Sequence, residues 1–319
     1  MNNEILKMPK VELHLHLDGS VPINVLCELS GLSYDEVYQK AVSENDTSLS
    51  IYLKRFDFIN SFIKTKDDLE LISYSLGKEL EKENVIYAEI RFAPLDYVSE
   101  TVTSDDVINS VLTGLKKCNL KTNLILCMRR GKDFSYNRRV IEIANKYLGK
   151  GVVAVDLVGD EEHFPFIEYK ELFNTCRYAG IPVTIHAGET NKRDIIDVSS
   201  YTKRIGHGIK IFDDDNLIDL IKRNNILLEI CPNSNLDTKI ISDYHHHPIK
   251  KIYQDNVKVS INTDNRTVSN ITLTEEYCNL INYLGFTIDE LYQMNLNAVN
   301  YSFLTDKEKD ELRKKLLVK

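Results

Sequence analysis

The sequence lacks the features that define a membrane or a nucleic-acid-binding protein. No apolar run approaches the roughly 18 residues that a membrane helix needs, and the first residues hold no apolar stretch long enough for a signal peptide. The net charge is −8, whereas binding to nucleic acid phosphates requires a basic patch. We therefore expect a cytoplasmic protein that binds neither membranes nor nucleic acid.

The chain also lacks a disulfide pattern and a domain linker. Its 319 residues include six scattered cysteines with no CxxC pair, and a reducing cytosol would keep them as thiols in the core. No low-complexity tract and no linker rich in Pro, Gly or Ser marks a boundary. We expect one domain over residues 1–319, and no obligate protein partner is evident.

Short apolar runs rich in β-branched residues recur along the chain and alternate with helical patterns. The predicted strands are Lys10–Leu17, Val85–Ala93, Thr122–Arg129, Val152–Val158, Pro182–Ala187, Arg204–His207, Ile226–Ile230 and Val257–Thr263. Eight strands, each followed by a helix, predict an α/β fold of the (β/α)8 TIM-barrel type. An open doubly wound sheet is the alternative, but no GxGxxG or P-loop motif follows any strand.

One interval is much longer than a single helix requires. The first two predicted strands are separated by an insertion at about residues 20–80, which contains helix-like stretches at Ile23–Leu32 and Ile51–Ile63. The second stretch places its apolar residues on one face at helical spacing. The pattern alone fits either a lid over the barrel or an extra helix packed on its outside.

Polar residues at the carboxyl ends of barrel strands are the candidates for catalysis. His14 and His16 lie two residues apart on the first strand, so both imidazoles face the same side. His186 ends the fifth strand and Asp264 follows the eighth. Each residue alone fits a polar strand terminus, but three imidazoles and one carboxylate together suit Zn²⁺ with a position left for water. Since zinc activates water near neutral pH, hydrolysis is the expected reaction class.

Hydrolysis also requires groups that handle protons. Glu189 lies on the loop that leaves the fifth strand and could protonate a leaving group or a substrate nitrogen. The alternative for Glu189 is a carboxylate favoured by a helix N-terminus. His207 could accept a hydrogen bond from the attacking water. Residues 245–247, which precede the eighth predicted strand, are all histidine. We expect that triplet to lie in a solvated loop rather than in a second metal site.

Four motifs occur in order along the chain. They are HxHxDG at His14–Gly19, HAGE at His186–Glu189, GHG at Gly206–Gly208 and NTD at Asn262–Asp264. Over nearly its whole length the chain resembles the adenosine deaminase family of the amidohydrolase superfamily. The resemblance implies a barrel with one Zn²⁺ per chain and hydrolytic deamination at purine C6. Strand four lacks the lysine that bridges two metals in binuclear relatives, which also favours a single metal.

The resemblance implies a role for each matching residue. His14, His16, His186 and Asp264 match the zinc ligands. Glu189 matches the residue that protonates purine N1, and His207 matches the residue that orients the attacking water and steadies the developing charge. The implied substrate-binding set is His16, Asp18, Gly159, Asn265, Leu49, Tyr52, Leu53 and Phe56.

Within that set, Asp18 matches the residue that binds a ribose hydroxyl, and Gly159 matches the glycine whose backbone N–H meets purine N3. Leu49–Phe56 resembles the lid segment over the substrate entrance, which favours a lid over an outer helix. Many family members carry a second aspartate after NTD that contacts purine N7. Here Asn265 takes its place, and its amide can donate to N7 directly.

The choice of purine follows from the same positions. Asp18 favours a substrate with a ribose, whereas adenine-specific relatives tend to carry Glu there. A nucleotide would require Arg or Lys near its 5′ end, and Lys54 and Arg55 would only flank the apolar face of the lid. We expect conversion of adenosine and 2′-deoxyadenosine to inosine and 2′-deoxyinosine. The alternatives are an adenine deaminase or other 6-aminopurine deaminase, a different hydrolase on this scaffold, and an idle nucleoside-binding relative.

Overall fold

The computed structural model describes residues 2–43 and 49–317, apart from the side chains of residues 2, 49–51 and 53. Its strands are β1 (Lys10–His16), β2 (Val85–Phe92), β3 (Lys121–Arg129), β4 (Val152–Val158), β5 (Ile185–Ala187), β6 (Arg204–His207), β7 (Leu227–Ile230) and β8 (Lys258–Ile261). All pairings between neighbouring strands are parallel, in two sheets of order β1-β2-β3-β4 and β5-β6-β7-β8.

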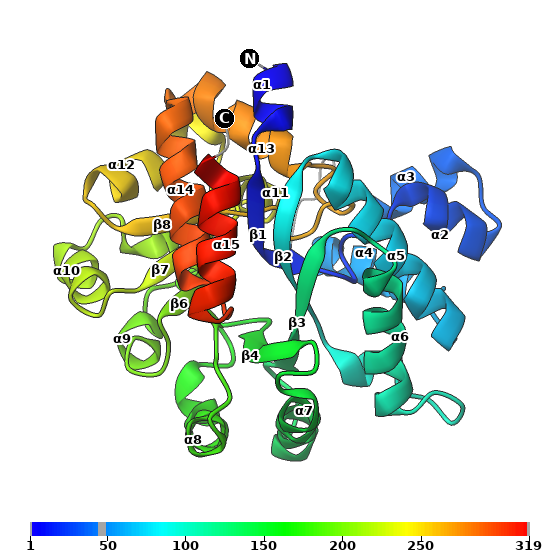
Figure 1. Cartoon of the computed structure of the whole chain (residues 1–319). Coiled ribbons are helices and arrows are strands. Elements are labelled where there is room, and N and C mark those ends of the chain that lie inside the picture. Colours follow the sequence, from blue (N-terminus) through cyan, green and yellow to red (C-terminus); the bar gives the residue numbers. More distant parts are fainter. Residues whose placement is uncertain (1, 44–48, 318–319) are drawn as a thin grey trace.

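The two sheets are joined at both of their edges. An isolated parallel bridge links Val155 of β4 to Val183, just before β5, and another links Leu15 of β1 to Asp264, just after β8. At the second seam, the backbone N–H of His16 donates to the Asp264 carbonyl at 2.7 Å. The strands therefore follow one another around a ring, as Figure 1 shows. The predicted (β/α)8 barrel is confirmed, and the open doubly wound sheet is excluded.

The helices surround this ring. They are α1 (Asn2–Lys7), α2 (Ile23–Ser30), α3 (Tyr34–Ala41), α4 (Leu49–Asn60), α5 (Lys66–Lys82), α6 (Ser104–Lys116), α7 (Phe134–Tyr147), α8 (Lys170–Ala179), α9 (Ile195–Val198), α10 (Asp215–Arg223), α11 (Pro232–Asp237), α12 (Ile249–Gln254), α13 (Leu273–Leu284), α14 (Ile288–Tyr301) and α15 (Asp306–Leu317). Short 3-10 turns are η1 (Pro94–Tyr97), η2 (Phe166–Tyr169), η3 (Ile209–Ile211) and η4 (Tyr244–His246). Reciprocal capping boxes begin several of the helices, including Thr103 with Asp106 at α6, because each satisfies two exposed backbone N–H groups.

The insertion between β1 and β2 forms helices α2 to α5. The predicted helix Ile51–Ile63 is shifted, since α4 runs from Leu49 to Asn60. Tyr52 of α4 is buried, and its hydroxyl accepts a hydrogen bond from the Asn265 amide at 3.1 Å. Because Asn265 directly follows Asp264 beyond β8, α4 lies over the carboxyl end of the barrel, as predicted for a lid rather than for an outer helix.

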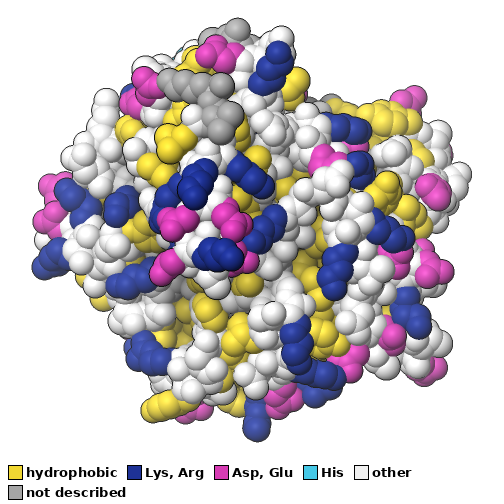
Figure 2. Space-filling view, in the orientation of Figure 1, with side chains coloured by type: hydrophobic (Ala, Val, Ile, Leu, Met, Phe, Trp, Pro, Cys, Tyr) yellow, Lys and Arg dark blue, Asp and Glu magenta, His cyan; other side chains and the backbone are white. Residues whose placement is uncertain are grey.

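The opposite end of the barrel is closed by α15, which lies in front of the strands in Figure 1. Its Leu312 and Leu316 pack with Val11 and Leu13 of β1 and Tyr87 of β2 in a separate apolar cluster. Basic, acidic and apolar side chains are interspersed on the face that Figure 2 shows, with no extended basic patch there. Within the described part of the chain, no helix is long and apolar enough to cross a membrane.

Candidate metal and active site

The structure gathers the four predicted metal ligands at the carboxyl end of the barrel. One ring nitrogen each of His14, His16 and His186 lies within 4.8 Å of the others. Asp264 Oδ1 lies 3.5 Å from His14 Nε2 and 3.4 Å from His16 Nε2. Strands β1 and β5 and the segment after β8 are far apart in sequence, but their carboxyl ends meet around the ring. Their role as metal ligands remains a prediction.

Two buried carboxylates orient two of these imidazoles. His14 Nδ1 lies 3.0 Å from Glu229 Oε2, and His186 Nδ1 lies 2.9 Å from Asp156 Oδ2. Arg91 holds both carboxylates, since its Nη1 is 2.6 Å from Asp156 and its Nη2 is 2.7 Å from Glu229. A carboxylate beside Nδ1 favours a proton there and leaves the Nε2 lone pair available for a metal.

The charges beneath the site are fully buried and compensate one another. Burial opposes ionisation of Glu229, but Arg204 and Arg91 hold the pKa of its carboxyl well below the ordinary value. Burial likewise opposes ionisation of Asp156, and the neighbouring His186 and Arg91 outweigh it, so the pKa of Asp156 is also lowered. These carboxylates therefore stay ionised and remain acceptors for the imidazole N–H groups.

The donor set fits a transition metal. Burial, assisted by the charge of Arg91, lowers the pKa of His14 to about 4, so the ring is neutral near pH 7. Its Nε2 is buried without a hydrogen-bond partner, which is costly unless another species fills that position. Three imidazoles, two of them with rings oriented by carboxylates, and one carboxylate form a set that suits Zn²⁺.

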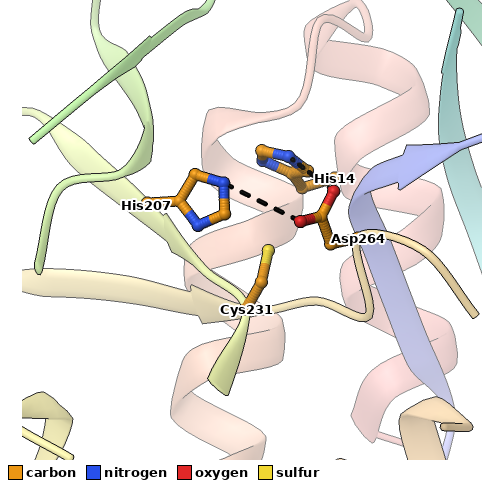
Figure 3. Close-up of side chains that lie close together, drawn as sticks. All are labelled: His14, His207, Cys231 and Asp264. Carbon is orange, nitrogen blue, oxygen red and sulfur yellow. Dashed lines mark ion pairs between the residues drawn. The ribbon is translucent and has the colours of Figure 1, made fainter. Parts of the chain in front are cut away.

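A second grouping overlaps the first. Possible ligand atoms of His14, His207, Cys231 and Asp264 also lie within 4.8 Å of one another, and Figure 3 shows these side chains converging. Burial and the charge of Asp264 raise the pKa of the Cys231 thiol well above its usual range, and a protonated thiol is a poor ligand. The geometry therefore favours the set with three imidazoles and Asp264.

Two residues of the cluster adopt a strained backbone. His207 has φ 61° and Asp264 has φ 60°, in the left-handed region that side chains other than glycine seldom occupy. Such strain persists where the surrounding structure fixes a residue, and it is concentrated at functional sites. Here it directs both side chains toward the centre of the cluster (Figure 3).

Glu189 lies at the edge of the same cluster. Its Oε2 is 3.7 Å from His207 Nε2, and its side chain is 20% exposed. Burial raises the pKa of Glu189, as do the charges of Asp264 and Glu161, and together they outweigh the opposing effect of His207. A carboxyl group with a raised pKa can be protonated near neutral pH and can then act as an acid.

The loop that carries Glu189 is held by another carboxylate. Glu161 accepts hydrogen bonds from the backbone N–H groups of Gly188 at 2.9 Å and of Asn191 at 3.1 Å. Glu161 is itself buried. Glu189 therefore projects from a fixed loop, and not from the start of a helix as the alternative interpretation required.

The predicted ribose end of the site is acidic. Asp18 is 17% exposed, and burial raises the pKa of its carboxyl to about 6 although the nearby Arg129 opposes this. Arg129 ends β3 and forms an ion pair with Asp96, which also accepts a hydrogen bond from the Tyr136 hydroxyl at 2.6 Å. The positive charge of Arg129 is thus already compensated.

Among the predicted base-contact positions, Asn265 directly follows Asp264 in the sequence. Asn265 is buried, and its Oδ1 lacks a hydrogen-bond partner. A Cβ atom on Gly19 would lie 2.0 Å from that oxygen, so only glycine fits beside it. Tyr52 contacts Phe56 edge to face at 5.6 Å, whereas the side chains of Leu49 and Leu53 lie outside the described residues. Gly159, directly after β4, has φ 106°.

The expectation of a fully solvated histidine triplet is wrong for one member. His245 and His246 are exposed, but His247 is 3% exposed and its Nε2 lies 3.2 Å from Asn235 Oδ1. Sequence reasoning also gave no role to Arg91, although a charged residue inside the apolar run of β2 was a visible signal. Asp156 and Glu229 were likewise assigned no role from the sequence.

Comparison with known proteins identifies relatives of the whole chain. The family model described as adenosine deaminase matches residues 9–319. An adenosine deaminase of Clostridium perfringens (strain SM101 / Type A) is 39% identical over 98% of this chain and 99% of its own length. One from Clostridium acetobutylicum is 37% identical over 99% of both. The crystal structure of Arabidopsis N6-mAMP deaminase MAPDA is 26% identical, with a TM-score of 0.85 over 98% of this chain and 99% of that one.

The first prediction concerns Arg91, which compensates two buried carboxylates. Arg91→Met leaves Asp156 and Glu229 without that partner, so we expect the free energy of unfolding to fall by roughly 3–5 kcal/mol. We also expect Zn²⁺ affinity to fall about 10- to 100-fold, because the imidazoles lose their fixed orientation. Chemical denaturation and competitive zinc titration measure the two effects. Arg138→Met is the matched control, since Arg138 is 66% exposed on α7. Unchanged stability and zinc affinity in Arg91→Met would contradict this account.

Proposed function

The chain belongs to the adenosine deaminase family, and on this premise we propose that it catalyses zinc-dependent hydrolytic deamination of adenosine and 2′-deoxyadenosine. The products are inosine or 2′-deoxyinosine and ammonia. The observation that carries the proposal is the cluster of three imidazoles and Asp264, with Glu189 and His207 at its edge. We also propose that residues 1–319 form one domain, including the insertion at about 20–80.

One zinc ion per chain would be held by His14, His16, His186 and Asp264. Bound there, zinc supplies Lewis-acid activation of water. Glu229 and Asp156 hold the rings of His14 and His186 so that the Nε2 atoms face the centre. Ser234 donates to Asp264 Oδ2 at 2.6 Å, which leaves Oδ1 directed toward the imidazoles. The second oxygen of this carboxylate is thus fixed by the protein itself.

Glu189 supplies the proton that activates the purine ring. In its protonated form it donates to N1, which makes C6 electrophilic and open to attack by water. The oxygen of that water forms a bond to C6, and the bond from C6 to the amino nitrogen then breaks. One of the two protons released by the water goes to the amino nitrogen, which leaves as ammonia, and the other restores the acid form of Glu189, whose first proton remains on N1 of the product. The overall reaction therefore consumes one water and releases one ammonia.

Residues around this centre are proposed to bind the substrate. Asp18 is proposed to bind a ribose hydroxyl and the Gly159 backbone N–H to meet N3. His16 lies beside Asp18 at the ribose end, with 4.0 Å between His16 Nδ1 and Asp18 Oδ1. Asn265 is proposed to contact N7, and Tyr52 and Phe56 of α4 to cover the base together with Leu49 and Leu53.

A nucleoside fits this site better than a nucleotide. Asp18 and Asp96 are both acidic at the ribose end, and the ion pair with Asp96 compensates the charge of Arg129. A 5′-phosphate carries about two negative charges near pH 7 and would meet net repulsion there. The structural relative from Arabidopsis is by its name a deaminase of a nucleotide, N6-mAMP, so the nucleotide is the specific alternative.

A substrate panel with metal analysis of the same sample tests the proposal. Adenosine, 2′-deoxyadenosine, AMP and adenine are each followed by the loss of absorbance that accompanies deamination, and bound zinc is counted per chain. We expect turnover of both nucleosides by protein with about one zinc. Absence of activity on all four substrates by zinc-loaded protein would refute the proposal.

Substitution of the proposed acid gives a second prediction. Glu189→Gln cannot donate the same proton, so we expect kcat for adenosine to fall about 10²- to 10⁴-fold with zinc content unchanged. Glu162→Gln is the matched control on a neighbouring exposed residue, and it should keep wild-type turnover. Near-normal kcat in Glu189→Gln would remove Glu189 from the role of acid.

A third prediction concerns the ribose end. Asp96→Asn removes one negative charge but keeps an oxygen that can accept from Arg129. We expect the ratio of kcat/KM for AMP to that for adenosine to rise about fivefold, and the gain to shrink at high salt. Asp105→Asn, on an exposed carboxylate of α6, is the control. An unchanged ratio at low salt would show that these charges do not select against phosphate.

A further inference from the structure

The ring of His207 is connected to a second buried histidine through one amide side chain. Asn235 Nδ2 lies 3.2 Å from His207 Nδ1, and Asn235 Oδ1 lies 3.2 Å from His247 Nε2. The backbone N–H of Ile249 donates to His247 Nδ1 at 3.2 Å. The hydrogen bonds thus run in sequence from the start of α12, through His247 and the α11 residue Asn235, to the end of β6.

The backbone N–H of Ile249, at the end of this series of hydrogen bonds, determines which group donates and which accepts in each of the others. A peptide N–H can only donate, so His247 Nδ1 must accept, and a neutral His247 then carries its proton on Nε2. That N–H requires an acceptor, so Asn235 presents its oxygen to His247 and its amide nitrogen to His207. Because the amide nitrogen can only donate, His207 Nδ1 must accept.

Burial supports the neutral state of His247. The ring is 3% exposed, and Asn235 is completely buried. Burial lowers the pKa of His247 to about 3, so this ring does not acquire a second proton near neutral pH. The backbone of Asn235 is fixed as well, since its N–H donates to the Cys231 carbonyl at 3.1 Å and its carbonyl accepts from Ile241 at 3.0 Å.

We propose that Asn235 and His247 are positioning residues that keep His207 Nδ1 a hydrogen-bond acceptor and the ring proton on Nε2. His207 therefore presents a hydrogen-bond donor to the reaction centre. Its Nε2 already faces that centre, at 3.7 Å from Glu189 Oε2 and 3.9 Å from Asp264 Oδ2. This reverses the acceptor role expected from the sequence.

The direction of this hydrogen bond determines what His207 can do. As a donor, it stabilises negative charge on the oxygen that adds to purine C6, but it cannot remove a proton from that oxygen. A histidine held in the wrong tautomer can lower kcat by orders of magnitude even when its position is kept. This catalytic consequence rests on the proposed function, whereas the tautomer of His207 does not.

The tautomer is measured directly by ¹⁵N NMR of zinc-loaded wild-type protein with ¹⁵N-labelled histidine. We expect a protonated Nε2 and an unprotonated Nδ1 for both His207 and His247, with His207 assigned from its loss in a His207→Gln sample. A proton on Nδ1 of His207, or on both nitrogens, at pH 7 would overturn the proposal. The result is independent of turnover, so inactive wild-type protein would refute the proposed function alone.

Variants then test whether the connection matters for catalysis. Asn235→Asp offers two acceptor oxygens, so His207 must place a proton on Nδ1 and its NMR pattern should change. His247→Leu removes the donor that orients the Asn235 amide. For both variants we expect kcat to fall about 10- to 100-fold, with little change in KM, because the substrate contacts are retained.

Two further variants separate positioning from structural damage. His247→Gln retains an N–H donor toward Asn235 and should recover most of the activity that His247→Leu loses. His246→Leu alters an exposed histidine in the same turn and should keep wild-type kcat and the wild-type NMR pattern. Wild-type kcat in both Asn235→Asp and His247→Leu, or no recovery in a folded His247→Gln protein, would overturn the proposal. If a variant does not fold, the ¹⁵N NMR spectrum of the wild-type protein still tests the proposed tautomer of His207.

Discussion

The interaction on which this site depends is the contact of one guanidinium with two carboxylates. Arg91 neutralises Asp156 and Glu229 inside the barrel, and each of these carboxylates faces the Nδ1 atom of a histidine above it. Without Arg91, Asp156 would lose its guanidinium partner and Glu229 would depend on Arg204, so keeping both carboxyl groups buried and ionised would cost more free energy. With Arg91, two imidazoles are held with their Nε2 atoms free. The arrangement suits a metal before any metal is present.

The barrel makes this arrangement possible by its topology. Parallel strands bring residues of β1, β2, β4, β5 and β7 to one level, and each inward side chain meets partners that are distant in sequence. His207 is also oriented by hydrogen bonds, because Asn235 and His247 determine which of its two ring nitrogens carries the proton. Acidic and amide partners therefore set the proton positions of three histidines around one centre.

Much of the fold and of the candidate site was predictable from the sequence. The features that were not predictable depend on how side chains pack in three dimensions. Alternation along β1 predicted that His14 and His16 share a face, and the recurrence of apolar runs predicted eight strands. The partnership of Arg91 with Glu229 was not predictable, because it depends on strand register across the barrel interior. The burial of His247 was missed because three adjacent histidines resemble a polar loop. The sequence pattern identifies the helices and strands, whereas the partners of buried polar side chains can be seen only in the packed structure.

We propose that three imidazoles and Asp264 hold the metal and that Cys231 does not bind it. X-ray absorption spectroscopy at the zinc edge, on protein loaded with one equivalent of Zn²⁺, distinguishes a ligand set with Cys231 from one without it. We expect only nitrogen and oxygen neighbours at about 2.0–2.2 Å, including the scattering pattern of three imidazoles. A sulfur neighbour at about 2.3 Å, or a zinc ion without imidazole scattering, would contradict it.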